Sequence, residues 1–270
     1  MIQHSVVQDG SAKPWVVFVH GAGGSSAVWW RQVRPFSKDY HLLLLDVHAE
    51  GAREAAPERR NYTFDALARE VLEVLVFRGI ERAFFVGVSM GCLVIEELAR
   101  IAPKKVSGMI LSGAIAGLDW RTRLLMGLGH LSKDVLPYMW LYRFFAWVIL
   151  PRWEHRESRK VFVREASKLG GKAFRRWYAL VGSLNVSLKR MQREGAAVPS
   201  LYVMGDEDVL FLKAVRAHVR TQTSAWIEVI DHCGHVVNIQ AAEQFNRISL
   251  AFMASVSAMG LSEAASARHI

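Results

Sequence analysis

The stretch that organises this chain reads Phe84-Phe85-Val86-Gly87-Val88-Ser89-Met90-Gly91-Cys92, an apolar run that ends in Gly-x-Ser-x-Gly. A serine with a glycine two residues away on each side fits a sharp strand-to-helix turn, because glycine lacks the side chain that would collide there. A helical pattern follows from Met90 to Ile101. The stretch therefore predicts a serine hydroxyl held out at the edge of a sheet.

Short apolar runs alternate with helical patterns on both sides of this turn. We expect strands at 14–20, 41–45, 84–88, 106–111, 199–204 and 225–230. We expect helices at 26–36, 64–78, 90–101, 209–220 and 236–259, the first two capped by Ser26 and Thr63. The alternation predicts an α/β fold class: a mostly parallel central sheet with helices on both faces.

The alternation stops at Gly113. Residues 115–195 contain no convincing strand, and they carry 16 Lys and Arg against 6 Asp and Glu, so this segment holds practically all of the net charge of +9. We expect it to form a helical cap (lid), inserted into a core built from residues 1–114 and 196–260, with a flexible tail at 261–270. The segment also holds five of the nine tryptophans, which are Trp120, Trp140, Trp147, Trp153 and Trp177.

Composition narrows the class of protein. The 270 residues are 51% hydrophobic and 22% charged, which suits one large globular domain with an insertion. Two cysteines cannot build a disulfide framework, and this favours a reducing compartment. We expect no signal peptide in residues 1–10 and no transmembrane segment, since the apolar stretch 144–151 is far shorter than the roughly 20 residues that span a bilayer. The expected location is cytoplasmic.

Two further strand ends carry residues that could activate a serine. A serine hydroxyl needs a base within hydrogen-bond reach and an acid that orients this base. Asp206 and Asp208 follow the strand expected at 199–204, and His232 and His235 follow the strand expected at 225–230. Parallel strands bring their carboxyl ends to one edge, so we expect these loops to lie beside Ser89.

Four motifs follow one another at expected strand ends, and in them the chain resembles the α/β-hydrolase fold superfamily. The resemblance covers roughly residues 12–113 and 197–258. The four motifs are His20-Gly21-Ala22-Gly23, Gly87-Val88-Ser89-Met90-Gly91, Gly205-x-x-Asp208 and Gly234-His235.

The resemblance implies a Ser-His-Asp catalytic triad on this nucleophile elbow. Ser89 would be the nucleophile, His235 the general base and later the general acid, and Asp208 the carboxylate that orients the imidazole. The backbone N–H groups of Ala22 and Met90 would form the oxyanion hole. The resemblance also implies that the cap is inserted after the sixth strand.

Each assignment has alternatives in the sequence. Asp206 and Asp119 compete with Asp208, but the spacing of three residues after Gly205 favours Asp208 and leaves Asp206 to brace the loop. Among the histidines, His235 is favoured over His232 because it follows a glycine and begins a helix. His20 is expected to shape the oxyanion loop. No His, Cys or Asp cluster has metal-ligand spacing, so we expect neither metal nor cofactor.

The chain departs from the family pattern in three places. Residues 46–51 replace the Arg-Gly-His-Gly-like loop of many relatives, so this turn is expected to be reshaped. Cys92 replaces a frequent second glycine and is expected to be buried filler. The portion before Pro14 is short, so the first strands of the sheet are expected to be reduced or absent.

The cap is expected to supply the substrate contacts. Its large apolar residues could build an apolar, partly aromatic wall for an acyl or aryl group, although we expect most of them to pack against other helices and only a minority to face the pocket. These residues are Leu124, Leu125, Met126, Leu128, Leu131, Tyr138, Met139, Trp140, Phe144, Phe145 and Trp147.

Basic residues of the cap could attract an acidic substrate, an acyl-carrier partner or anionic lipid heads. The simpler interpretation is a solvated helix face, partly paired with Glu154, Glu157 and Glu165. Nucleic acid is not expected as a partner, because the segment would cover a serine triad. The basic residues are Arg152, Arg156, Arg159, Lys160, Arg164, Lys172, Arg175 and Arg176.

The expected function is that of a serine hydrolase resembling carboxylesterases, which cleaves a carboxylic ester or related acyl bond of a small apolar substrate through an acyl-serine intermediate. Thioester, amide, lactone and carbon–carbon bond hydrolysis are variants of this mechanism. Ser89 argues against relatives with an aspartate nucleophile, such as epoxide hydrolases and dehalogenases. The alternative from another class is a ligand-binding or signalling protein that keeps the fold without hydrolysis.

Overall fold

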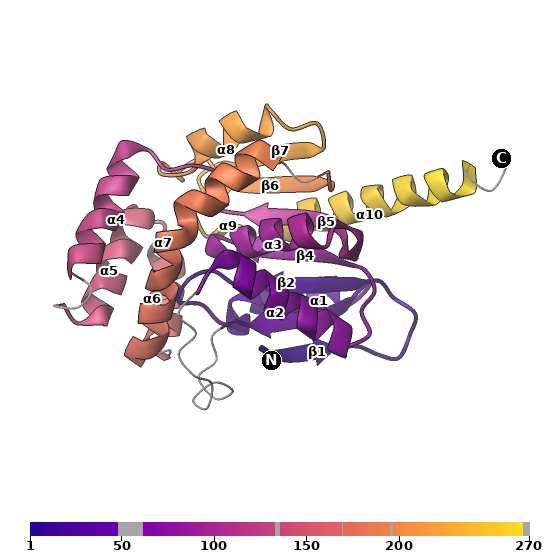
Figure 1. The fold of residues 1–270 in the computed structure, drawn as a ribbon, viewed down its shortest axis with the longest axis horizontal. Coiled ribbons are helices and arrows are strands. Elements are labelled where there is room, and N and C mark those ends of the chain that lie inside the picture. Colours follow the sequence, from indigo (N-terminus) through magenta and orange to yellow (C-terminus); the bar gives the residue numbers. More distant parts are fainter. Residues whose placement is uncertain (48–61, 133–135, 169, 195–196, 267–270) are drawn as a thin grey trace.

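The computed structural model describes residues 1–47, 62–132, 136–168, 170–194 and 197–266, and its centre is a seven-stranded sheet (Figure 1). The strand order is β1-β3-β2-β4-β5-β6-β7, and all neighbours pair in parallel except β1 with β3. The predicted α/β class with a mostly parallel sheet is therefore confirmed. The strands are β1 Gln3–Val7, β2 Trp15–Val19, β3 His41–Asp46, β4 Ala83–Val88, β5 Val106–Ser112, β6 Ser200–Gly205 and β7 Ala225–Ile230.

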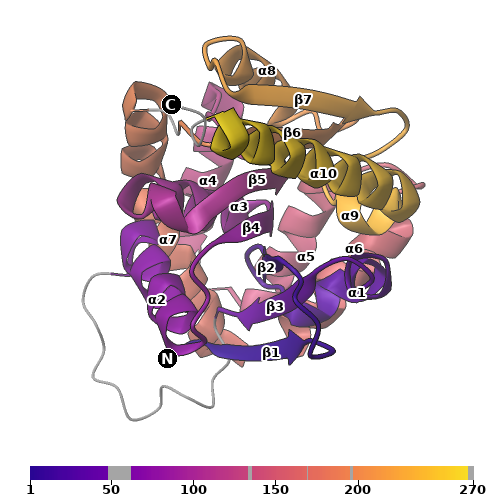
Figure 2. The same cartoon turned by 90° about the vertical axis from the view of Figure 1, so that its right-hand side faces the viewer.

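Helices cover both faces of the sheet, as Figure 2 shows. Side chains along a strand point alternately to the two faces, so Val17 and Val19 pack with α2 (Phe64–Phe77) and α3 (Met90–Ile101). Val16 and Phe18 pack on the opposite side with α1 (Trp30–Phe36) and α10 (Ala242–Ser266). The remaining core helices are α8 Leu212–Val219, α9 Val237–Gln240 and the short 3-10 turns η1 Ser26–Trp29 and η3 Pro103–Lys105.

The helices on both faces of the sheet hold the strand ends in place. The Phe18 ring lies 5.0 Å from the Trp29 ring and 5.3 Å from the Phe36 ring, and all three are fully buried. Full burial of such a side chain stabilises the fold by roughly 1.5–3 kcal/mol. The loops at the carboxyl ends of the strands therefore start from a rigid platform.

The portion before Pro14 contributes one strand, where the sequence analysis expected the first strands to be reduced or absent. Residues 3–7 form β1, which pairs antiparallel with β3 from Gln3 opposite Asp46 to Val7 opposite Leu42. An edge strand pairs on one side only, so its sequence needs no strong apolar pattern. With β1 counted, the segment after Gly113 follows the fifth strand of this chain and not a sixth.

Several helix boundaries also differ from the predicted ones. Ser25, not Ser26, caps η1, because the N–H and hydroxyl of Ser26 both donate to the Asp46 carboxylate. The closing helix is interrupted at Ala241 and then continues to Ser266, past the expected end at Met259. Thr63 caps α2 as predicted, since its hydroxyl accepts the Ala66 N–H. The reshaped turn expected at 46–51 lies outside the described residues from 48 onward.

Four helices lie between β5 and β6, beyond the carboxyl ends of the parallel strands (Figure 1). They are α4 Trp120–Ser132, α5 Tyr138–Ile149, α6 Arg156–Lys168 and α7 Gly170–Glu194. Apolar residues of α7, such as Leu180 and Leu184, join the same core cluster as α2 and α3. In the described ranges, no helix has both the length and the apolar character to cross a bilayer.

Candidate active site

Ser89 sits on a strained turn between β4 and α3. Its φ of 55° and ψ of −122° place it in a region that residues other than glycine seldom occupy. The Ser89 N–H donates to the Ser112 carbonyl at 2.9 Å, which ties the turn to β5. A side-chain carbon on residue 91 would come within 2.6 Å of the His20 carbonyl oxygen, so only glycine fits there. The turn holds the serine hydroxyl at the sheet edge, as the pentapeptide predicts.

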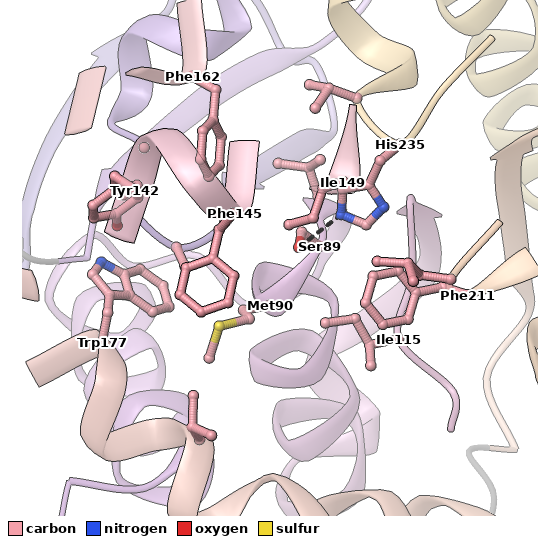
Figure 3. Close-up of a pocket in the computed structure, with 18 of the residues that line it drawn as sticks. Ser89, Met90, Ile115, Tyr142, Phe145, Ile149, Phe162, Trp177, Phe211 and His235 are labelled. Atoms are coloured by element: carbon pink, nitrogen blue, oxygen red, sulfur yellow. Dashed lines mark hydrogen bonds between the residues drawn. The ribbon is translucent and has the colours of Figure 1, made fainter. Parts of the chain in front are cut away.

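The structure brings Ser89, His235 and Asp208 together. His235 Nε2 lies 3.0 Å from Ser89 Oγ, and His235 Nδ1 lies 2.7 Å from Asp208 Oδ2 (Figure 3). Asp208 Oδ1 accepts the Phe211 N–H at 3.3 Å, and the Phe211 ring lies 5.2 Å from the imidazole. Because the carboxylate can only accept, Nδ1 carries the proton and Nε2 is free to accept from the serine hydroxyl.

The alternative residues have other contacts. Asp206 Oδ1 accepts the Cys233 N–H at 3.1 Å and so braces the loop before His235. Asp119 accepts the Thr122 N–H at 2.8 Å in the first turn of α4. His232 is exposed, with a positive φ of 54°. Among these residues, Asp208 and His235 alone are hydrogen-bonded to each other and, through His235, to Ser89.

Ala22 and Met90, the two residues expected to form the oxyanion hole, line the same cavity as Ser89. Met90 is the first residue of α3, where backbone N–H groups have no acceptor within the helix.

His20 supports the loop that carries Ala22. Its Nδ1 donates to the Gly21 carbonyl at 2.8 Å, and its Nε2 accepts the Val47 N–H at 3.0 Å. This arrangement requires the neutral imidazole. Burial lowers the pKa of His20, which keeps the ring in that form. The expectation that His20 shapes this loop agrees with these contacts.

A second polar cluster, which the sequence analysis missed, touches the loops of Asp208 and His235. The Glu207 carboxylate pairs with Arg152 at 2.5 Å and with Nε2 of the fully buried His155 at 2.7 Å. The Glu207 N–H donates to the Cys233 carbonyl at 2.9 Å, and the His155 ring fills the space beside Gly234. Nothing in the local sequence distinguishes His155 from the other nine histidines, because the contact joins residues 52 positions apart.

A cavity of about 190 Å³ opens above Ser89. Figure 3 shows Tyr142, Phe145, Phe162 and Trp177 on one side of Ser89 and Ile115 and Phe211 on the other. Its lining combines strand-end loops with residues of α4, α5, α6 and α7, and it contains no Lys or Arg among the described side chains. The cavity is shaped for an apolar group.

Glu165 of α6 is the one carboxylate among the described residues that line the cavity. Its side chain accepts from the Ser25 hydroxyl at 2.9 Å and from Lys168 at 2.9 and 3.0 Å. Burial raises the pKa of Glu165, but the hydrogen bonds from Lys168, Ser25 and Arg164 outweigh it and hold the pKa below its usual range. The cavity wall therefore holds an ionised carboxylate at neutral pH, and this carboxylate is paired with Lys168 and Arg164.

The apolar residues expected to form a wall divide into two sets. Leu125, Met126 and Phe145 line the cavity. The prediction that a minority faces the pocket is thus confirmed, but the prediction that the rest pack against other helices is wrong for five of them. Leu124, Leu128, Trp140, Phe144 and Trp147 are exposed.

The remaining nucleophile and ligand candidates are inert in this structure. The Cys92 thiol is buried, lies 3.4 Å from the Ser112 carbonyl, and has a raised pKa because of burial, so it acts as filler. In the described part of the chain, His, Cys, Asp and Glu side chains form no group of three that could hold a metal ion.

Comparisons with known proteins establish the family and agree with the fold. A family model described as "Alpha/beta hydrolase family" matches residues 16–248, and the chain belongs to this family. A relative from Cronobacter sakazakii named "Putative carbamate hydrolase RutD" is 25% identical over 249 residues, which are 90% of this chain and 91% of that protein. The enol-lactonase of Burkholderia xenovorans superposes with a TM-score of 0.74 at 21% identity, covering 94% and 96% of the two chains. A hydrolase from Oleispira antarctica superposes with a TM-score of 0.77 at 13% identity, covering 93% of each chain.

Proposed function

We propose that this protein is a serine hydrolase that cleaves an ester or related acyl bond of a neutral, apolar substrate. The observation that carries the proposal is the chain of hydrogen bonds from Ser89 Oγ through His235 to Asp208, at 3.0 and 2.7 Å. Its position under an apolar cavity and its two backbone donors support the same function.

The proposed first step is acylation of Ser89. His235 Nε2 takes the hydroxyl proton while Oγ attacks the substrate carbonyl carbon, and the carbonyl oxygen gains the negative charge. The N–H groups of Ala22 and Met90 receive this oxyanion, and Asp208 stabilises the imidazolium that forms. His235 then gives the proton to the leaving oxygen, and the carbonyl re-forms as the acyl-serine.

Water completes the reaction. It loses a proton to His235, attacks the acyl carbon, and forms a second tetrahedral intermediate on the same two donors. Collapse of this intermediate releases the carboxylic acid, and the proton returns from His235 to Ser89 Oγ.

The cavity favours a neutral substrate over an anionic one. Among its described lining residues there is no cation to bind a carboxylate, and the only described carboxylate in the lining, Glu165, is already paired with Lys168 and Arg164. The relatives named for carbamate and lactone hydrolysis also act on acyl bonds, which supports the reaction class. The width of the apolar lining supports an acyl or aryl group larger than a small carbamate.

The four helices α4–α7 are proposed to act as the cap, with residues 1–114 and 196–260 as the catalytic core. The cap would exclude water and select the substrate, since α4–α7 supply more than ten lining residues of the cavity. The core would supply the reacting groups.

A fluorophosphonate probe tests the proposal. This probe reacts with activated serines, so we expect stoichiometric labelling of the wild type and none of Ser89→Ala. Ser249→Ala, which removes another buried serine hydroxyl on α10, serves as the matched control and should keep full labelling. Absence of label on the folded wild type would favour the non-hydrolytic alternative, and label that persists on Ser89→Ala would exclude Ser89 as nucleophile.

Nitrophenyl esters of graded chain length then define the substrate. We expect kcat/KM to rise with chain length until the cavity is full. We expect an ester with a terminal carboxylate to react roughly 10-fold more slowly than its neutral isostere, because its charge would be desolvated in an apolar cavity that offers it no cation. Equal rates for the two esters would contradict the proposed selectivity.

A further inference from the structure

Helix α5 is apolar on two opposite sides, although only one side is covered. Its twelve residues include a single charged one, Arg143. Leu141, Tyr142 and Ala146 are buried inside the molecule. Trp140, Phe144 and Trp147 point outward at helical spacing and are 66%, 52% and 63% exposed. A helix that is apolar all round is normally buried all round, but nothing in the part of the chain that the structure describes covers the outer side of α5.

The neighbouring elements extend this apolar surface. Leu124, Leu128 and Trp120 on α4 are exposed at spacings of four residues, and Trp153, after α5, is 72% exposed. The two helices pack together, since any side chain on Gly129 of α4 would meet the Phe145 ring of α5 at 2.7 Å (Figure 1). We call the outer cap face the set Trp120, Leu124, Leu128, Trp140, Phe144, Trp147 and Trp153.

Among the described residues beside the outer cap face, cations outnumber the exposed carboxylates, which are Asp119 and Glu154. Helices α4 and α5 contain no Asp or Glu, and Arg123 and Arg143 are exposed on them. The Arg156 guanidinium lies 4.8 Å from the Trp153 ring, and Arg159 lies 6.0 Å from the Trp147 ring. These stacks place a cation next to an exposed indole.

Two acidic residues of the segment have partners away from the outer cap face. Glu165 is buried against Ser25 and Lys168, and Glu157 lies 3.9 Å from Arg31 of the core. The sequence analysis predicted that glutamates of the cap partly pair with its basic residues. Glu165 does pair with Lys168 and Arg164, but among the described side chains no glutamate pairs with Arg156 or Arg159 beside the outer cap face. Lys172, Arg175 and Arg176 lie outside the described side chains.

We propose that the outer cap face docks on an anionic lipid surface. Tryptophan and arginine suit the boundary between lipid headgroups and acyl chains, where an indole buries its ring and a guanidinium binds phosphate. Each cation near such a surface strengthens the attraction to anionic lipid. A second copy of the chain fits less well, because it would bring two strongly basic segments against each other.

The other side of the same helices lines the cavity above Ser89. Tyr142 and Phe145 face inward while Trp140 and Phe144 face outward, so one helix separates the docked surface from the site. Docking would thus place the cavity next to a source of apolar acyl groups. This consequence rests on the proposed function, whereas docking itself does not.

Flotation with vesicles tests the proposal on the full chain. We expect binding to vesicles of phosphatidylcholine with about one third phosphatidylglycerol, weaker binding to pure phosphatidylcholine, and loss of the difference at high salt. The double variant Trp140→Ser/Trp147→Ser should bind at least tenfold more weakly, because two indoles no longer enter the lipid. Trp226→Ser, which removes an exposed tryptophan of β7, is the matched control and should bind like the wild type.

Three results would overturn the proposal. They are absence of wild-type binding to the anionic vesicles, equal binding of the double variant and the wild type, and a solution dimer that the double variant dissociates. Unchanged circular dichroism and fluorophosphonate labelling without vesicles establish that the variant is folded. Flotation of Ser89→Ala separates docking from hydrolysis, because this variant cannot hydrolyse a substrate but should still bind vesicles. If the proposed hydrolase function is wrong, docking can still be measured by flotation, and if docking is wrong, hydrolysis can still be measured with soluble esters.

Discussion

The loops at the carboxyl ends of β4, β6 and β7 differ sharply from the outer cap face. In the loops, polar groups have partners within the molecule, from His235 with Asp208 to Asp206 with the Cys233 N–H. On the outer cap face, large apolar side chains meet solvent. The difference teaches that the polar side chains of the loops are satisfied within one chain, whereas the covering segment leaves large apolar side chains exposed.

The largest expected effect tests whether the loops hold one defined triad. Asp208→Asn should lower kcat/KM about 10⁴-fold, because an asparagine can no longer fix the imidazole tautomer that leaves Nε2 free to accept. Asp206→Asn is the control in the same loop. It keeps an oxygen for the Cys233 N–H and should lose no more than about tenfold. If the two variants lost activity equally, the assignment of Asp208 over Asp206 would fail.

The next effect tests whether Glu96, a buried carboxyl on the helix that follows Ser89, makes the stability of the fold depend on pH. Glu96 of α3 is buried and accepts the Tyr202 hydroxyl at 2.7 Å. Burial raises the pKa of Glu96 to about 7. The hydrogen bond from Tyr202 lowers this pKa in part, and the nearby charge of Glu97 raises it slightly further. Because the folded pKa lies above the unfolded one, the protonated form stabilises the fold below about pH 4.5, and this contribution is lost as pH rises through about 7.

Glu96→Gln should therefore abolish this pH dependence. The glutamine oxygen still accepts from Tyr202 and carries no charge at any pH, so the variant should be roughly 2–3 kcal/mol more stable than the wild type at pH 8. At pH 5 the difference should nearly vanish. Urea unfolding at the two pH values measures this, and a pH-independent difference would mean that Glu96 is not the titrating group.

The contact between Glu207 and His155 links the two regions of the comparison. Glu207→Gln should cost roughly 1–3 kcal/mol of unfolding free energy, because Arg152 and the buried His155 lose a charged acceptor. Since Glu207 adjoins Asp208, we also expect kcat to fall by about tenfold with KM little changed. Glu154→Gln, an exposed change one residue before His155, should alter stability by less than about 0.5 kcal/mol. A loss in KM alone would argue against positioning of the catalytic loops.

The sequence predicted what local rules enforce. Thr63, Gly91 and the run before Ser89 each act through neighbours a few residues away, so their structures follow from spacing and steric limits. The pairing of β1 with β3 and the contact of His155 with Glu207 join distant residues, and no local pattern encodes them. The outward direction of Trp140 and Trp147 was equally hidden, because an apolar helix shows no preferred face in its sequence.

The smallest effects should separate the two sides of α5 at adjacent positions. Phe144→Ser removes an exposed ring and should change the free energy of unfolding by less than about 0.5 kcal/mol, with kcat/KM for a soluble ester unchanged. Phe145→Ser removes a ring that lines the cavity and packs on Gly129, and it should cost about 1–2 kcal/mol and raise KM for long-chain esters. Urea unfolding and ester kinetics on the pair provide the measurement. Similar losses at both positions would mean that the outer side of α5 is already covered within the molecule, and the contrast between the two regions would then disappear.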